Sequence, residues 1–155
     1  MTALSVTVKP AAILGGIDIT TKRDILETAA SQAAECYGLD QEELKRGLIE
    51  REKLGTTGFG GSVAVPHAKV KDLHECVGVV IRLENTVDYQ AHDGRPVDLV
   101  FALFSPEGGG AVHLKALAEI SRLLRDEEIV AKLRGADNAD AIYALLTGQR
   151  EQQAA

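Results

Sequence analysis

The sequence contains no tryptophan, one methionine, and three residues each of phenylalanine and tyrosine. Hydrophobic residues make up 45% of the chain and aromatic residues only 4%. The core must therefore be formed mainly by aliphatic side chains. Cysteine is also scarce, since Cys36 and Cys76 are the only two and lie far apart. The N-terminus shows no positive charge before its short apolar stretch, so no export signal is expected. Both cysteines are therefore expected to be reduced thiols in a cytoplasmic protein.

Basic residues and long apolar runs are also few. Lys and Arg total 17 against 23 Asp and Glu, the formal net charge is -6, and no basic run is longer than two residues. A nucleic-acid partner is not expected, because binding to phosphate backbones relies on clustered cations. Apolar runs such as Leu99–Phe104 are far shorter than the roughly 20 residues of a membrane span, so membrane insertion is not expected either.

The length of 155 residues fits one domain, since an ordinary domain has roughly 150 residues. No internal repeat, low-complexity linker or shift in composition divides the chain. We therefore expect one domain over residues 1–148 and a flexible C-terminal tail over residues 149–155. The 26% of charged residues is typical of a folded soluble protein.

Hydrophobic periodicity predicts the order of secondary structure. Strands are predicted over residues 16–20, 62–65, 76–83 and 97–104, and the alternation in residues 4–8 favours a further edge pairing. Helices are predicted over residues 22–37, from 40 to 55, over 112–124, in a short segment after Asp126, and over 139–146. The order β-αα-βββ-ααα places helices before and after a block of strands, which predicts a three-layer α/β/α sandwich around a mixed β-sheet.

The residues that suggest chemistry lie between positions 51 and 69, in REKLGTTGFGGSVAVPHAK. Glycines such as Gly58 and Gly60 let backbone amides approach an anion, and Thr57 and Ser62 add hydroxyl donors. His67 follows directly after a proline, which stiffens the backbone from which the imidazole extends. The sequence therefore predicts an anion-binding loop beside a histidine. The alternative is a flexible hairpin loop with an unrelated histidine.

Two known motifs, the nucleotide-binding P-loop and the nucleophile elbow of hydrolases, do not fit this stretch. It is not a P-loop, because no Gly-Lys-Ser/Thr ends the glycine run and no helix is predicted after it. Ser62 is not a nucleophile elbow, because that motif needs a glycine two residues later and a strand before the serine.

A second candidate, His113, stands at the start of the predicted helix 112–124 and follows three glycines. A helix N-terminus attracts anions, so a histidine there can donate to a phosphoryl oxygen, although it can equally be a surface residue. His74 and His92 lie in polar turns and are expected to be solvated. The four histidines have no ligand-like spacing, so neither a metal nor a cofactor is expected.

The stretch Gly58–His67, together with the preceding segment REKLGTT at residues 51–57 and the later HLKAL at residues 113–117, resembles the enzyme IIA proteins of the bacterial phosphotransferase system. The resemblance covers nearly the whole chain and is greatest to the nitrogen-regulatory type, a relative of the fructose and mannitol IIA domains. It implies that His67 is the phosphoryl acceptor, His113 its neighbour and Arg51 a cation at the rim. One departure is the glycine triplet before His113, where the family usually has more polar residues.

The resemblance implies a phosphotransferase component that accepts its phosphoryl group from the histidine phosphocarrier protein. It further implies regulatory targets such as potassium transporters or sensor kinases, controlled by the phosphorylation state. Two alternatives remain open at this point. One is a sugar-specific IIA protein that donates to a IIB protein, and the other is an anion-sensing binding module of the same fold.

Overall fold

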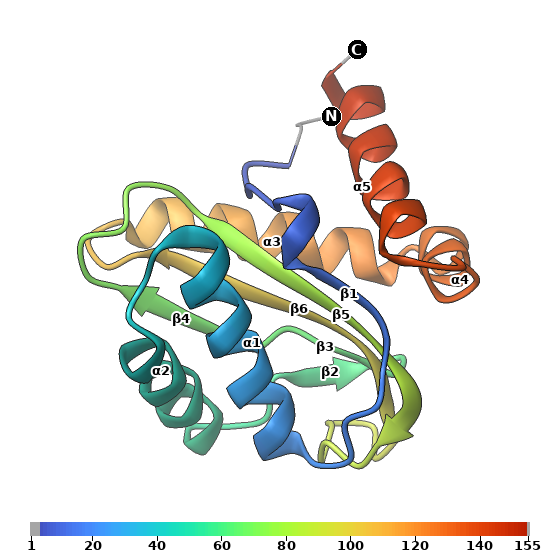
Figure 1. Cartoon of the computed structure of the whole chain (residues 1–155), viewed down its shortest axis with the longest axis horizontal. Helices are drawn as coiled ribbons and strands as arrows, with labels where there is room; N and C mark the ends of the chain where they lie inside the picture. The colour runs from blue at the N-terminus through green and yellow to red at the C-terminus, as the bar shows by residue number, and fades with distance from the viewer. Residues whose placement is uncertain (1–3, 155) are drawn as a thin grey trace.

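The computed structural model describes residues 4–154, and its centre is a six-stranded sheet (Figure 1). The strands are β1 Ile13–Ile17, β2 Gly58–Gly60, β3 Val63–Ala64, β4 His67–Val70, β5 Val77–Val87 and β6 Val97–Pro106. Their order is β1-β5-β6-β3-β2, and β4 continues beyond β3 along the same side of β6. β5 and β6 are antiparallel, whereas β1 on β5 and both β3 and β4 on β6 are parallel. The sheet is therefore mixed, as predicted.

Helices cover both faces of this sheet. They are α1 Lys22–Tyr37, α2 Gln41–Lys53, α3 Gly110–Arg125, α4 Glu127–Arg134 and α5 Ala139–Ala154, with a short 3-10 turn η1 at Pro10–Ala12. Figure 1 shows α1 and α2 in front of the sheet and α3 behind it. α1 packs on β5 and α2 on β4, while α3 packs on β6 and α5 on β1. The predicted α/β/α sandwich is confirmed.

The two central strands supply side chains alternately to two separate cores. Val79 and Ile81 of β5 belong to the core under α1 and α2, whereas Val80 belongs to the core under α3, α4 and α5. In β6, Phe104 faces the first core and Leu103 the second. Both strands are buried on both faces, which explains why their sequences are nearly continuous in apolar residues.

The first predicted strand lies three residues too late in the sequence. β1 runs over Ile13–Ile17 instead of residues 16–20, and its register on β5 shifts between Gly15 and Ile17, where Gly16 has a φ of +73°. The alternation in residues 4–8 was interpreted correctly, because Thr7 forms a parallel bridge with Val77. The N-terminal segment therefore continues the edge formed by β1, alongside the start of β5.

Where one strand was predicted over residues 62–65, the structure has three short strands, β2, β3 and β4. β2 and β3 form a hairpin whose two turn residues, Gly61 and Ser62, have φ values of +67° and +65°. Positive φ at both positions is what a tight two-residue hairpin turn requires. The edge then breaks at Val65–Pro66 and resumes as β4, with His67 paired to Leu103. The histidine thus begins a strand instead of following one.

The helix predictions need only small corrections at their ends, except for the last helix. Thr21 and Asp40 cap α1 and α2 through hydrogen bonds to backbone amides, and Asp126 caps α4 in the same way. α5 continues to Ala154, eight residues beyond its predicted end at Leu146, while Ala155 lies outside the described residues. The flexibility of residues 149–155 stays a prediction. Among residues 4–154, no helix is both long and apolar enough to cross a membrane.

Close packing at Gly78 of β5 gives a test of the fold. A Cβ atom added there would lie 2.6 Å from Cε1 of Phe101 and 3.3 Å from Cγ1 of Val6. Gly78→Ala is therefore expected to lower the free energy of unfolding by about 1–3 kcal/mol, the usual cost of overpacking a core. Urea denaturation measures the change.

Gly148→Ala is the matched control, because Gly148 lies in α5 with no atom within 4 Å of an added Cβ. This substitution is expected to leave stability unchanged or to raise it by up to ~1 kcal/mol through helix propensity. Equal stability of the two variants would contradict the packing described for β5.

Candidate functional site: a paired-histidine centre

His67 is held by its own strand in one tautomer. Its Nδ1 lies 2.8 Å from the carbonyl oxygen of Val65, a residue whose amide donates to Thr57 and which therefore faces away from β6. A carbonyl oxygen only accepts hydrogen bonds, so Nδ1 carries the proton. In the neutral ring Nε2 then carries the lone pair, which is the arrangement that a nitrogen nucleophile needs.

Arg51, in the last turn of α2, covers this lone pair. Its Nε donates to Nε2 of His67 over 3.0 Å, and its Nη1 donates to the carbonyl oxygen of Gly55 over 2.9 Å. The second bond fixes the guanidinium at the C-terminal end of the helix. The predicted cation of the site is therefore in direct contact with the predicted nucleophile.

His113 joins the site from the opposite layer. The ring centroids of His67 and His113 are 5.3 Å apart and the two rings are inclined by 47°. His113 is only 7% exposed, and its Nδ1 lies 2.8 Å from Oγ of Ser105 in β6. The interpretation of His113 as a surface residue is therefore wrong, because it lies in the fourth position of α3, which packs on β6. His74 and His92 are exposed, as expected.

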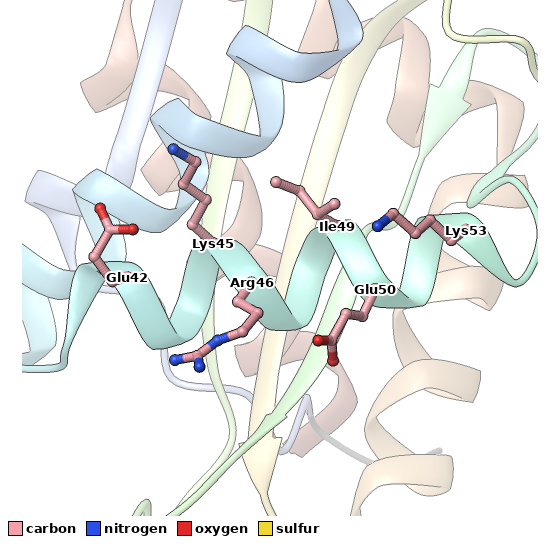
Figure 2. Close-up of a pocket in the computed structure, with 6 residues that line it drawn as sticks. All are labelled: Glu42, Lys45, Arg46, Ile49, Glu50 and Lys53. Atoms are coloured by element: carbon pink, nitrogen blue, oxygen red, sulfur yellow. The ribbon is translucent and has the colours of Figure 1, made fainter.

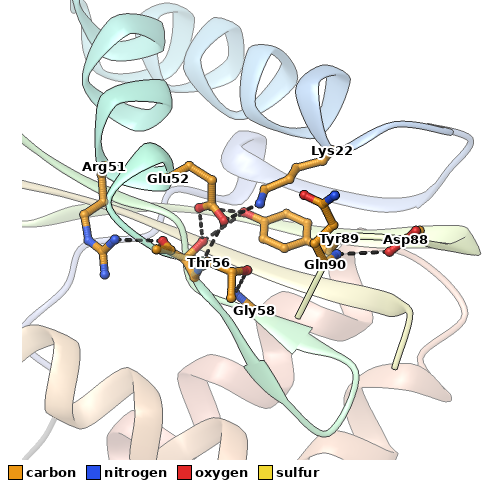
Figure 3. A network of polar contacts seen from close by, with 10 residues as sticks. Lys22, Arg51, Glu52, Thr56, Gly58, Asp88, Tyr89 and Gln90 are labelled. Atoms are coloured by element: carbon orange, nitrogen blue, oxygen red, sulfur yellow. Dashed lines mark hydrogen bonds and ion pairs between the residues drawn. The ribbon is translucent and has the colours of Figure 1, made fainter. Parts of the chain in front are cut away.

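A buried carboxylate beside Arg51 organises the loop after α2 (Figure 3). Glu52 accepts from the amide and hydroxyl of Thr57 over 2.9 and 2.6 Å, and pairs with Nζ of Lys22 at 2.6 Å. Oγ of Thr57 also lies 2.9 Å from the hydroxyl of Tyr89. The sequence singled out Thr57, but it gave no indication of Glu52, whose partners lie in α1 and in the segment after β5.

Burial and hydrogen bonds determine the protonation states of Glu52 and Tyr89. Burial acts to raise the pKa of Glu52, but hydrogen bonds from Lys22 and Thr57 outweigh burial and leave that pKa below its usual value. Burial raises the pKa of Tyr89 well above its usual range, and the carboxylate of Glu52 adds to the effect. Glu52 is therefore ionised and Tyr89 neutral at physiological pH. Together they hold Thr57 at the base of the loop.

The glycines of the predicted anion-binding loop have packing partners of their own. A Cβ on Gly58 would lie 2.8 Å from Cβ of Ala91, and a Cβ on Gly60 would lie 3.3 Å from a carboxylate oxygen of Asp93. The amide of Gly58 donates to Oγ1 of Thr56, and that of Gly61 donates to Asp93. These two amides already have acceptors. The glycines therefore let the hairpin lie close to residues 89–93.

Both imidazoles are kept neutral. Burial lowers the pKa of His67, and the positive charge of Arg51 lowers it further, against the opposing effects of the Val65 carbonyl and the Glu52 carboxylate. Burial also lowers the pKa of His113, with additional contributions from His67, Lys69 and Arg51. A lowered histidine pKa means that the neutral form predominates at pH 7.

Other hollows of the surface are separate from this centre. Figure 2 shows a pocket lined only by side chains of α2, namely Glu42, Lys45, Arg46, Ile49, Glu50 and Lys53. Its lining carries both positive and negative charges and includes neither His67 nor His113. Across the described part of the chain, no group of three or more His, Cys, Asp or Glu residues is arranged to hold a metal ion.

The fold and the site define an α/β protein with a candidate histidine nucleophile beside a second histidine and an arginine. Comparison with known proteins identifies the family. Residues 7–149 match the family described as "Phosphoenolpyruvate-dependent sugar phosphotransferase system, EIIA 2", and the chain belongs to it. The resemblance inferred from the sequence is thereby confirmed.

The relatives place the chain near the nitrogen-regulatory members of this family. It is 48% identical over 139 residues to a nitrogen regulatory protein of Bradyrhizobium diazoefficiens, covering 90% of this chain and 91% of the relative. It is 35% identical over 134 residues to one of Pseudomonas aeruginosa, covering 86% and 87%. The chain is therefore a homologue of the nitrogen-regulatory IIA phosphocarriers.

Solved structures agree with the fold. The crystal structure of nitrogen regulatory protein IIA-Ntr from Neisseria meningitidis superposes with a TM-score of 0.84 at 29% identity, covering 90% of this chain and 95% of that one. The mannitol IIA structure from Escherichia coli gives 0.76 at 23% identity, covering 90% and 99%. The second likeness concerns the fold alone.

The contact between Arg51 and His67 gives a test by titration. Arg51→Gln removes a positive charge that opposes protonation of the ring and a donor that stabilises its neutral form, so the pKa of His67 is expected to rise. Imidazole resonances followed by NMR from pH 4 to 8 measure this pKa.

Arg46→Gln is the control, because Arg46 is an exposed residue of the same helix that lines the pocket of Figure 2. It is expected to leave the pKa of His67 unchanged. A pKa in Arg51→Gln equal to or lower than that of the unmodified protein would contradict the geometry of the pair.

Proposed function

We propose that this protein carries a phosphoryl group on Nε2 of His67, which it accepts from the phosphohistidine of the histidine phosphocarrier protein. The observation that supports the proposal is the bond from Nδ1 of His67 to the Val65 carbonyl, which leaves the lone pair on Nε2. The family membership supports a role as a IIA component of the phosphotransferase system.

In the transfer, the lone pair on Nε2 forms a bond to phosphorus while the bond between phosphorus and the donor's ring nitrogen breaks. The electron pair of the broken bond stays with the donor imidazole. Nδ1 of His67 keeps its proton and goes on donating it to the Val65 carbonyl as a hydrogen bond, so no general base is needed. Phosphoryl transfer depends chiefly on alignment and on charge stabilisation, which these residues supply without a metal or another cofactor.

The phosphorylated ring would carry about -1.5 to -2 charges on its phosphoryl group. Once Nε2 is bonded to phosphorus, Nε of Arg51 loses its acceptor and can donate to a phosphoryl oxygen instead. His113 is close enough to donate from the other side, and the N-terminus of α3 adds the positive end of a helix dipole. Direct phosphoryl-binding roles for Thr57, Gly58, Gly60 and Ser62 stay predictions.

The regulatory role follows from the relatives. Curated relatives at 48% and 35% identity are named nitrogen regulatory proteins, which supports control of partner proteins by the phosphorylation state of His67. Potassium transporters and sensor kinases are the partners that we propose, in keeping with the family resemblance. Such a carrier acts in the cytoplasm.

Reconstituted labelling tests the acceptor. With phosphoenolpyruvate, enzyme I and the histidine phosphocarrier protein, the unmodified protein is expected to gain one acid-labile, base-stable phosphoryl group. His67→Ala is expected to abolish the label with little loss of stability, because the ring is only half-buried. His113→Ala is expected to slow labelling and leave some label. Mass spectrometry and autoradiography measure both.

His92→Ala is the matched control, because His92 is exposed in a turn, and it is expected to be labelled like the unmodified protein. Equal labelling of His67→Ala would refute the assignment. Failure of the unmodified protein to take up label from an active donor would favour the anion-sensing alternative. Loss of label to a fructose- or mannitol-specific IIB protein would favour the sugar-specific alternative.

A further inference from the structure

A buried chain of polar side chains extends from His113 into the core. Nδ1 of His113 lies 2.8 Å from Oγ of Ser105, and Sγ of Cys76 donates to the same oxygen over 3.5 Å. The exposed fractions are 7% for His113, 0% for Ser105 and 2% for Cys76. Ser105 is thus a polar residue at the end of the fully buried run 99–105 of β6, and no step of the proposed transfer uses it directly.

The hydrogen bonds around Ser105 have one arrangement that satisfies every donor. A hydroxyl has one hydrogen to donate and two lone pairs to accept with. The thiol of Cys76 takes one lone pair. If Nδ1 of His113 also donated to this oxygen, the buried hydroxyl hydrogen would be left with the weakly accepting thiol sulfur at best. The hydroxyl of Ser105 therefore donates to Nδ1, and the proton of the neutral His113 ring lies on Nε2.

The position of that proton matters for the proposed transfer. Burial and nearby positive charges lower the pKa of His113, so that the ring carries one proton instead of two. Phosphoryl oxygens accept hydrogen bonds and cannot donate them at neutral pH. A neutral His113 can therefore stabilise a phosphoryl group beside His67 only if its single proton is on the nitrogen that faces away from Ser105.

We propose that Ser105 is a positioning residue that fixes His113 in the tautomer able to donate from Nε2 to the transferred phosphoryl group. The inference rests on the proposed function of His67 for its catalytic consequence, whereas the tautomer itself does not depend on that function. Among the described residues no hydrogen bond joins Ser105 to His67, so Ser105 acts through the ring of His113.

The local backbone explains why such an anchor is needed. α3 begins directly after a glycine at its N-cap, Gly109, and that position has no capping side chain. A Cβ at Gly108 or Gly110 would have no atom within 4 Å, so side chains at these two positions could not help to hold the helix start. The bond to Ser105 ties the first turn of α3 to β6. The orientation that the glycine triplet leaves undefined in the sequence is set by a residue of the sheet.

The tautomer is tested directly by NMR. Long-range 1H–15N spectra of histidine-labelled protein at pH 7.5 distinguish a protonated from an unprotonated ring nitrogen. His113 is expected to show a protonated Nε2 in the unmodified protein and to lose this preference in Ser105→Ala. Ser105→Thr keeps the hydroxyl and is expected to restore the Nε2-protonated form.

Transfer kinetics test the consequence. Ser105→Ala is expected to lower the maximal rate of phosphoryl transfer on the order of tenfold, the factor expected for the loss of one hydrogen bond to a charged group. Its KM for the phosphocarrier protein is expected to stay unchanged, because Ser105 is 0% exposed and cannot contact a partner. Ser105→Thr is expected to recover most of the rate.

Cys76→Ala is the matched control, since it truncates another buried side chain that contacts the same oxygen. The hydroxyl of Ser105 keeps Nδ1 as its acceptor in this variant, so both the tautomer and the rate are expected to stay as in the unmodified protein. Comparable circular dichroism of all variants shows that they are folded.

Two outcomes overturn the inference. One is a protonated Nδ1 on His113 in the unmodified protein, whatever the labelling of His67. The other is a Ser105→Ala variant with an unchanged tautomer and an unchanged rate. If the unmodified protein takes up no label from an active donor, the proposed function fails and the catalytic consequence with it, while the spectra still decide the tautomer.

Discussion

The site depends on one carbonyl at the edge of the sheet. The amide of Val65 donates to Thr57 on the side away from β6, whereas the carbonyl of Pro66 accepts from Leu103 of β6. The carbonyl of Val65 therefore points to the open edge, where it accepts from the side chain of His67. Pro66 restricts the backbone between these two residues. The bond to Val65 fixes which nitrogen of His67 carries the lone pair, and the other groups of the site are arranged around that nitrogen.

All three layers of the sandwich contribute to this centre. The sheet edge supplies His67, the front layer supplies Arg51 from the end of α2, and the back layer supplies His113 from the start of α3. Each of these side chains is also hydrogen-bonded to a residue outside the three. Val65 holds His67, Gly55 holds Arg51 and Ser105 holds His113. The geometry is therefore preorganised by the fold, which reduces the reorganisation needed during transfer.

Much of the fold could be predicted because the helices carry their own local signals. Thr21 and Asp40 cap helices where the sequence indicated caps, and these ends are accurate to within two residues. Strand β2 was missed, since its glycines give no alternation to detect. Glu52 and Ser105 were also missed, because no local pattern marks their roles and because Lys22 and Cys76 meet them only through tertiary packing. Local chemistry is readable in the sequence, whereas the groups that support it depend on tertiary contacts.

The bond between Arg51 and His67 has a consequence for the unloaded protein. The same guanidinium cannot rest on the lone pair of Nε2 and leave that pair open to an electrophile. In the transfer proposed for His67, Arg51 therefore covers the acceptor nitrogen until a negatively charged group draws the guanidinium away. Under that proposal, the resting state favours an arriving phosphate over uncharged electrophiles.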